Sequence, residues 1–192
     1  MGIPKIDTGP MTVEEFYAFT DSRPDDEKWE LIDGEPVLNA TPSFLHQRIA
    51  GNIHSHLLVL ENERRPSWTV LLGIGVRISG TKLPVPDVLV RPEAAPLGNP
   101  LSRECDDMIV AFEVLSPSTS DRDLRWKRGA YTALPTLTHY VVAAQDTVDV
   151  AVFERAKGFA ERRLKSLADE LHFDSLGVSV PLAVIYRNTV LK

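Results

Sequence analysis

Two acidic residues interrupt apolar stretches that otherwise have the composition of buried strands. Glu113 lies in the middle of "MIVAFEVL" (108–115), and Asp87 lies inside "LPVPDVLV" (83–90). A buried carboxylate normally protonates, pairs with a cation or binds a metal, because leaving it unpaired costs free energy. If the two strands are neighbours, both carboxylates can share one divalent cation. Hard oxygen donors of this kind favour Mg²⁺, with Mn²⁺ as a substitute, over zinc.

Lys127 is a candidate because helical spacing places it on the face that should point toward the sheet. It lies three residues after Leu124 and four before Tyr131 in a predicted helix. A lysine amine beside a metal-bound phosphate can orient the attacking water or offset developing negative charge. The alternative is that the stem of the side chain packs while its ammonium group reaches solvent.

Glu30 is the fourth candidate. It precedes Asp33-Gly34, the dipeptide that suits a type I′ hairpin turn, inside "WELIDGEPVLN". A carboxylate at this place could support a metal from the side. The opposing interpretation is a solvated glutamate that alternates with apolar neighbours on an edge strand.

Among the histidines, His46 lies three residues before Ile49, on the core side of a predicted helix. A lone histidine there is more often a structural core residue than a ligand or a base, so it is only an accessory candidate. His54 and His56 are two residues apart and cannot share one helix face, which excludes them as paired metal ligands. Cys105 has acidic neighbours that would raise its pKa and weaken it as a nucleophile.

Periodicity predicts the elements that must position these residues. Thr12 and Glu15 form a capping-box pattern that begins a short helix, and the hairpin around Asp33-Gly34 follows. The predicted helices after it span 43–61 and Ser120 to about Leu134, with strands at 68–73, 75–79, 85–92, 108–115, 139–144, 148–155 and 162–167. Residues 92–105 are expected to form a surface loop, and the tail to Lys192 has no clear periodicity. The chain is therefore predicted to be one α/β domain over residues 1–192 with a mixed sheet.

Composition excludes several classes of protein. The 192 residues carry a net charge of −6, which argues against a protein whose main role is to coat nucleic acid. The basic segment 155–165 is more simply a solvated edge, although it leaves a local basic groove open. No apolar run is long enough to span a bilayer, and the N-terminus lacks the pattern of a secretory signal. These features predict a cytoplasmic protein that does not bind membranes.

Five segments, taken in order, resemble the Uma2 family (DUF820) of restriction-endonuclease-like proteins. They are "WELIDGEPV", "SFLHQRIAGNI", "PVPDVLV", "FEVLSPSTSDRDLRWKRGAY" and "HYVVAA". The resemblance covers roughly residues 11–144, and its most specific part is the EVLSPST segment with the D, K and Y of the next helix. It implies the PD-(D/E)XK nuclease superfamily, whose core is a mixed β-sheet flanked by helices.

The resemblance also implies roles for individual residues. Asp87, after Pro86, corresponds to the motif aspartate, and Glu113 corresponds to the motif acid. The usual lysine of the superfamily would fall on Leu115, and Lys127 from the following helix takes its place. Glu30 matches an acidic residue ahead of the hairpin turn, which implies a third carboxylate beside the metal, and His46 matches the histidine at the start of the long helix.

These observations predict a Mg²⁺-dependent endonuclease that hydrolyses phosphodiester bonds in nucleic acid, with DNA as the expected substrate. A non-catalytic module that keeps the nuclease fold and binds nucleic acid or a protein is the alternative, favoured by the acidic balance of the chain. A third interpretation pairs the two acids with Arg91 or Arg125 and involves no metal. A double-strand cut needs two active sites, which favours a homodimer.

Overall fold

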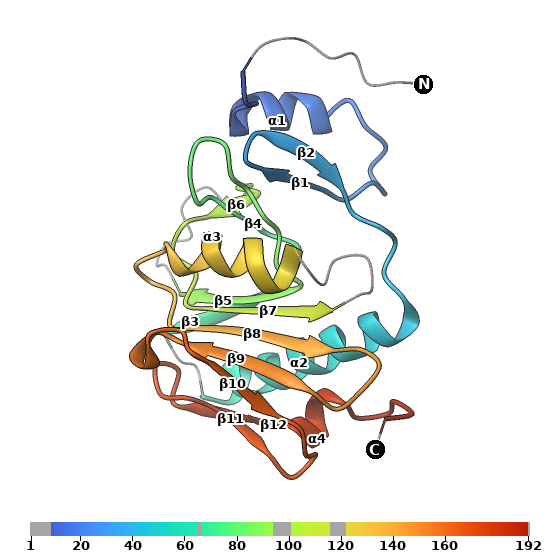
Figure 1. The fold of residues 1–192 in the computed structure, drawn as a ribbon, viewed down its shortest axis with the longest axis vertical. Helices are drawn as coiled ribbons and strands as arrows, with labels where there is room; N and C mark the ends of the chain where they lie inside the picture. The colour runs from blue at the N-terminus through green and yellow to red at the C-terminus, as the bar shows by residue number, and fades with distance from the viewer. Residues whose placement is uncertain (1–8, 65–66, 94–100, 116–121, 192) are drawn as a thin grey trace.

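The computed structural model describes residues 9–64, 67–93, 101–115 and 122–191. It is a mixed α/β structure in which helices flank a central sheet of six strands, with an N-terminal helix and hairpin at one end (Figure 1). The predicted fold class is therefore confirmed.

The central sheet has the strand order β10-β9-β8-β7-β5-β3. Its strands are β3 (Trp68–Leu71), β5 (Val88–Pro92), β7 (Val110–Leu115), β8 (His139–Ala144), β9 (Val150–Glu154) and β10 (Glu161–Leu164). β7 and β8 run parallel, and the other neighbouring strands run antiparallel. The register of β5 on β7 pairs Val88 with Phe112. Continuing it by one residue places Asp87 opposite Glu113, so the two acidic positions are neighbours across the sheet.

The two faces of the sheet have separate cores, because successive residues of a strand point to opposite sides. The long helix α2 (Phe44–Arg64) covers one face, and the short helix α3 (Arg128–Thr132) covers the other. The α2 core includes Ile49, Ile53 and Leu57 of the helix with Val88, Phe112 and Val114 of the sheet. The α3 core includes Tyr131 with Leu89, Ala111 and Tyr140. Glu113 alternates with Phe112 and Val114 along β7 and therefore belongs to the α3 face.

The N-terminal part forms a smaller unit that packs around its own apolar cluster. Helix α1 (Val13–Thr20) begins with the predicted capping box at Thr12. Strands β1 (Trp29–Ile32) and β2 (Glu35–Leu38) form the hairpin, and positive φ angles at both turn residues suit a type I′ turn. Leu31 forms a β-bridge with Leu83, four residues before Asp87. The hairpin is thereby attached next to the segment that carries the aspartate.

The helix that carries Lys127 departs from the prediction. Its predicted start at Ser120 lies outside the described residues. From Arg122 to Lys127 the chain forms a π-helix, and α3 continues it to Thr132. Single π-helical turns are rare within α-helices, and those that do occur are often found at functional sites.

Four further elements were not predicted from periodicity. Within the stretch expected to be a loop, β6 (Glu104–Cys105) pairs in parallel with the short strand β4 (Gly75–Val76). The tail, which could not be assigned, forms the hairpin of β11 (Glu170–Phe173) and β12 (Val178–Pro181) and then the helix α4 (Leu182–Ile185). These elements add Phe173, Val180 and Ile185 to the α2 core.

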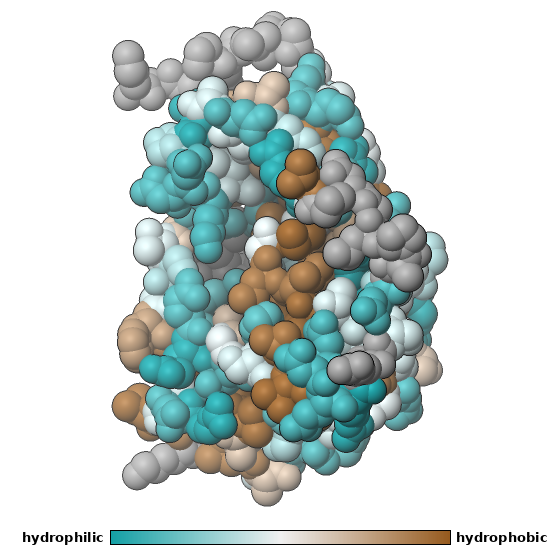
Figure 2. Space-filling model, turned by 180° about the vertical axis from the view of Figure 1, so that it is seen from behind, coloured by the Kyte–Doolittle hydropathy of each residue, from teal (hydrophilic) through white to brown (hydrophobic). Residues whose placement is uncertain are grey.

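Large hydrophobic side chains also remain at the surface. Leu58 and Val59 of α2 and Leu72 after β3 are exposed. Figure 2 shows the molecule from behind, with hydrophobic residues gathered in a band that hydrophilic residues flank. Apolar atoms contribute more than half of a typical protein surface, so the band alone does not identify an interface. Within the described part of the chain, no helix is long and apolar enough to cross a membrane.

Candidate active site

The centre of the candidate site is the ammonium group of Lys127, which lies between two carboxylates. Its Nζ is 2.8 Å from Oε1 of Glu113 and 2.9 Å from Oε1 of Glu30. The Lys127 side chain is only 3% exposed, and the two glutamates are equally buried. The interpretation in which the ammonium reaches solvent is therefore wrong.

Helical geometry brings Tyr131 to the same carboxylate. It lies four residues after Lys127, and its hydroxyl donates a hydrogen bond of 3.0 Å to Oε1 of Glu113. Burial, followed by the charges of Glu113 and Glu30, raises the pKa of Tyr131 well above its ordinary value. The phenol therefore keeps its proton and remains a donor to Glu113.

Glu30 reaches the site from the hairpin. Its Oε1 accepts a hydrogen bond of 2.7 Å from the backbone N–H of Val85, in addition to the contact with Lys127. The side chain of Glu30 is fully buried, so the interpretation as a solvated edge residue is wrong. Glu30 connects the N-terminal unit to the strand segment before Asp87 and to the helix that carries Lys127.

Asp87 and His46 form the second half of the site. Asp87 directly precedes β5, and its Oδ2 accepts a hydrogen bond of 2.7 Å from the backbone N–H of Val114. Nε2 of His46, in the first turn of α2, lies 3.2 Å from the same oxygen. Asp87 keeps 25% of its side chain exposed and His46 keeps 13%, so this half of the site faces solvent. His46 thus contacts the predicted aspartate rather than serving only as a core residue.

All five predicted residues therefore lie in two adjoining groups. Glu30, Glu113 and Lys127 form the buried group, and Asp87 with His46 forms the half-buried group. Strand β7 joins the two, because Glu113 belongs to the first group and the next residue, Val114, binds Asp87. The site combines residues of β1, α2, β7, the π-helix and the segment directly before β5.

The predicted ligand set for a metal, Asp87, Glu113 and Glu30, stays a prediction. Among the described residues, no group of three histidine, cysteine or acidic side chains is arranged to hold a metal ion. The three carboxylates are thus not assembled around one point, since Glu30 is directed toward Lys127. Mg²⁺, however, commonly uses one or two protein carboxylates and completes its shell with water and phosphate oxygens. Asp87 and Glu113, opposite each other on neighbouring strands, fit that pattern, and a metal contact by Glu30 stays a prediction.

The sequence left open that the site acids pair with Arg91 or Arg125. For Arg91, this pairing is not found. Its guanidinium forms two hydrogen bonds with Asp107, from Nε to Oδ1 at 2.8 Å and from Nη2 to Oδ2 at 2.7 Å. The described partners of the site acids are instead Lys127 for Glu113 and His46 for Asp87. Among the described contacts, Glu113 and Asp87 are therefore held by residues of the candidate site, and a pairing with Arg125 stays a prediction.

Cys105 belongs to a short buried strand and not to an exposed loop. Burial, with a smaller contribution from the charge of Asp107, raises the pKa of its thiol to about 11. The expected loss of nucleophilicity is therefore supported, although burial contributes more than the acidic neighbours. His54 and His56 lie apart from the site, and Nε2 of His56 is 3.3 Å from the carbonyl oxygen of Ser179.

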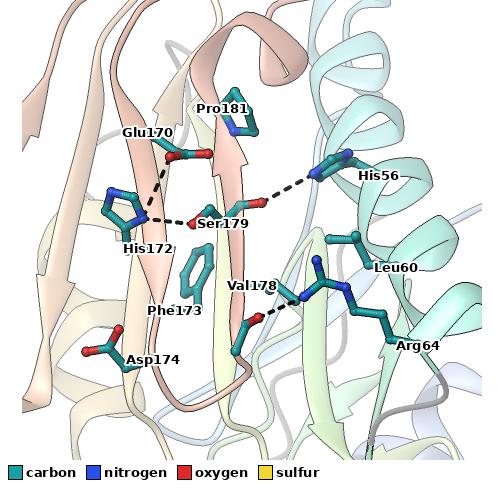
Figure 3. Close-up of a pocket in the computed structure, with 11 residues that line it drawn as sticks. His56, Leu60, Arg64, Glu170, His172, Phe173, Asp174, Val178, Ser179 and Pro181 are labelled. Atoms are coloured by element: carbon teal, nitrogen blue, oxygen red, sulfur yellow. Dashed lines mark hydrogen bonds and ion pairs between the residues drawn. The ribbon is translucent and has the colours of Figure 1, made fainter.

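A cavity of about 490 Å³ lies away from the candidate site, between α2 and the β11–β12 hairpin (Figure 3). His56 and Arg64 of α2 contact backbone carbonyls of the hairpin there, and Nδ1 of His172 lies 2.8 Å from the hydroxyl of Ser179. None of the five predicted site residues lines this cavity. Its contacts attach the hairpin to the helix.

Sequence reasoning missed Tyr131 as a member of the site. The residue was placed on the apolar stripe of its helix, which is correct, but its hydroxyl also binds Glu113. A signal was present, because a buried tyrosine usually finds a hydrogen-bond partner for its hydroxyl group. The backbone donors Val85 and Val114 could not be found, since contacts of this kind leave no trace in residue types.

The chain belongs to the Uma2 family, whose description is "Putative restriction endonuclease" and whose profile matches residues 13–183. A crystal structure of "a putative nuclease belonging to DUF820 from Anabaena variabilis ATCC 29413" is similar, with a TM-score of 0.73 over 92% of this chain and 98% of that chain. The two sequences are 16% identical, so this likeness shows a shared fold. Comparison with curated proteins gives no match.

Proposed function

We propose that the protein is a Mg²⁺-dependent endonuclease that hydrolyses phosphodiester bonds in nucleic acid, with DNA as the expected substrate. The observation that carries this proposal is the buried contact of Lys127 with Glu113, one strand away from the half-exposed Asp87. A lysine beside an acidic pair is an arrangement suited to phosphoryl chemistry. Family membership supports the same class of reaction.

Each residue of the site would have a distinct role in the reaction. Bound at Asp87 and Glu113, Mg²⁺ would polarise the scissile phosphate and lower the pKa of a coordinated water. Lys127 would stabilise the negative charge that develops on the phosphate or position the attacking water. Glu30 and Tyr131 would hold Lys127 and Glu113 in place, and His46 would orient Asp87. Such supporting contacts matter because small displacements of reacting groups reduce rates strongly.

Cleavage by substituted proteins tests this proposal. We expect Asp87→Asn, Glu113→Gln and Lys127→Ala each to abolish Mg²⁺-dependent cleavage of plasmid DNA and of labelled single-stranded and duplex oligonucleotides, while the protein stays folded. Glu161→Gln is the matched control, because this exposed glutamate pairs only with Arg163 in the described structure and should keep full activity. Full activity in Asp87→Asn or Glu113→Gln would contradict the mechanism.

The second candidate function is a non-catalytic module that binds nucleic acid or a protein partner. It is favoured by the contacts of Lys127 with both glutamates, which give these buried acids a structural role without a metal. This function predicts no turnover on any substrate. It also predicts that binding is indifferent to Asp87→Asn, so one binding measurement beside the cleavage assay separates the two candidates.

Cleavage of both strands of a duplex would further require two active sites. We propose a homodimer on this ground, since two-fold dimers are the commonest oligomers. Light scattering coupled to size-exclusion chromatography, with and without DNA, tests it, and a monomer under both conditions would contradict it.

A further inference from the structure

The outer side of the helix that carries Lys127 contains a cavity of about 480 Å³ with a basic lining. Its lining includes Arg125, Arg128, Gly129, Thr132, Gly158 and Phe159. The described residues that line it include two arginines and no acidic side chain. Two guanidinium groups in one lining suit an anionic ligand.

The backbone of Phe159 is held in a costly conformation at this cavity. Its φ angle is 56°, and it follows Gly158 with a φ angle of 63°. A bulky residue with positive φ is a genuine outlier, and such strain persists where surrounding contacts impose it, often at binding sites. Here Nη2 of Arg128 donates a hydrogen bond of 2.8 Å to the carbonyl oxygen of Phe159. The guanidinium of Arg155 lies 5.0 Å from the centroid of its ring.

The orientation of the Arg128 side chain is fixed by its contacts, and further N–H groups of its guanidinium can bind a ligand. Its guanidinium lies 4.4 Å from the centroid of the Phe153 ring, and one nitrogen binds Phe159. A guanidinium has several N–H groups in a planar fork, which is the geometry that matches phosphate oxygens. Arg125, three residues earlier, brings a second guanidinium to the same cavity.

We propose that this cavity binds a backbone phosphate of the DNA strand that enters the candidate site. Arg125 and Arg128 supply the charge, and the strained Gly158–Phe159 segment forms another part of the lining. The inference rests on the proposed function, because it assigns a contact to the same substrate. Arg128 directly follows Lys127, so a phosphate held here fixes the substrate along the helix that presents the buried lysine. The contact carries no sequence information, because every nucleotide has the same phosphate.

Binding without cleavage tests the inference. Fluorescence anisotropy measures the affinity of a short fluorescein-labelled DNA duplex in EDTA over a series of salt concentrations. We expect Arg125→Gln and Arg128→Gln each to weaken binding on the order of tenfold at fixed salt. Each should also reduce the slope of log affinity against log salt by about 1. The loss should be the same for duplexes of unrelated sequence.

Arg187→Gln is the matched control, since this exposed arginine lies after α4 on the α2 side of the sheet and should leave affinity unchanged. Arg125→Gln keeps the test informative if Arg128→Gln fails to fold, because the Arg125 side chain is exposed. Unchanged affinity and slope in the folded variants, an equal loss in Arg187→Gln, or no DNA binding by the wild type overturns the inference.

The result separates this inference from the proposed function. Loss of binding in the arginine variants of a protein that never cleaves supports the phosphate contact and contradicts the endonuclease. Unchanged binding, together with cleavage that depends on Asp87, contradicts the phosphate contact alone.

Discussion

The two faces of strand β7 differ sharply in what they bury. On the α2 side, Phe112 and Val114 pack in a continuous apolar core with Ile49 and Ile53. On the α3 side, Glu113 is just as inaccessible, but it contacts the ammonium of Lys127 and the hydroxyl of Tyr131. One backbone thus supports a hydrocarbon core on one side and a charged group on the other.

The comparison shows which face contributes stability and which is suited to chemistry. Apolar side chains gain free energy on burial roughly in proportion to the area they remove from water. Buried ion pairs gain little or nothing net, because desolvation offsets their attraction. A charged cluster placed where hydrocarbon would stabilise more is best explained by a function that needs it.

The largest effect is expected from Lys127→Met, which leaves two buried carboxylates without their shared cation. We expect the free energy of unfolding to fall by about 3–5 kcal/mol, because the glutamates lose their compensating charge. Urea denaturation measures this change, and the cleavage assay should show no activity. The triple variant Glu30→Leu, Glu113→Leu, Lys127→Met should regain stability while staying inactive. A triple variant that is less stable than Lys127→Met would show that the charged cluster does not reduce the stability of this side of β7.

Phe112→Ala should destabilise the apolar core on the α2 side of β7. A cavity in the α2 core is expected to cost about 3–5 kcal/mol of unfolding free energy. Because Phe112 points away from the site, the fraction that remains folded should cleave DNA at the rate of the wild type. A specific loss of activity per folded molecule would show that the two faces are not separable.

Tyr131→Phe should have a smaller effect, because it removes only the hydroxyl that binds Glu113. A hydrogen bond to a charged group is worth about 1.5–3 kcal/mol, so stability should fall by no more than this. The affinity for Mn²⁺, measured by calorimetry, should also fall, because Glu113 loses a contact that orients it. Unchanged Mn²⁺ affinity with reduced stability would limit Tyr131 to a structural role.

The smallest effect concerns His139 on β8, whose ring packs against Phe173 of the α2 core. Burial lowers the pKa of His139, although Glu154 and Asp174 oppose the shift. The folded state therefore binds fewer protons than the unfolded state, and stability should decline as the pH falls below about 6.5, the ordinary histidine value. His139→Gln should reduce this decline in thermal unfolding measured between neutral and acidic pH. His54 contributes in the same direction, since burial also lowers its pKa, so some pH dependence should remain.

The charged side of β7 was predictable from the sequence to a large extent. Glu113 and Asp87 stand out because they break apolar runs, and the register of β5 on β7, continued by one residue, places them opposite each other. Lys127 follows from helical spacing, since both the lysine and Tyr131 do face the sheet. The hairpin turn at Asp33-Gly34 and the capping box of α1 depend on local residue types, which is why they were found.

The remaining features depend on contacts between distant segments. Nothing in the neighbourhood of Glu30 indicates that it binds the backbone of Val85, because the hairpin must first dock beside that strand. The approach of His46 to Asp87 likewise depends on where α2 begins relative to the sheet. Strands β11 and β12 do alternate between buried and more exposed residues, but each is only four residues long, so the pattern was too short to be assigned from the sequence.

A crystal of the protein with Mn²⁺ and a short DNA oligonucleotide tests the central claim most directly. The account predicts an anomalous peak between Asp87 and Glu113, about 2.0–2.4 Å from an oxygen of each carboxylate. Lys127 should remain beside Glu113, directed toward the phosphate. A structure with bound DNA, no metal at this position and Asp87 still engaged only with His46 and Val114 would contradict it.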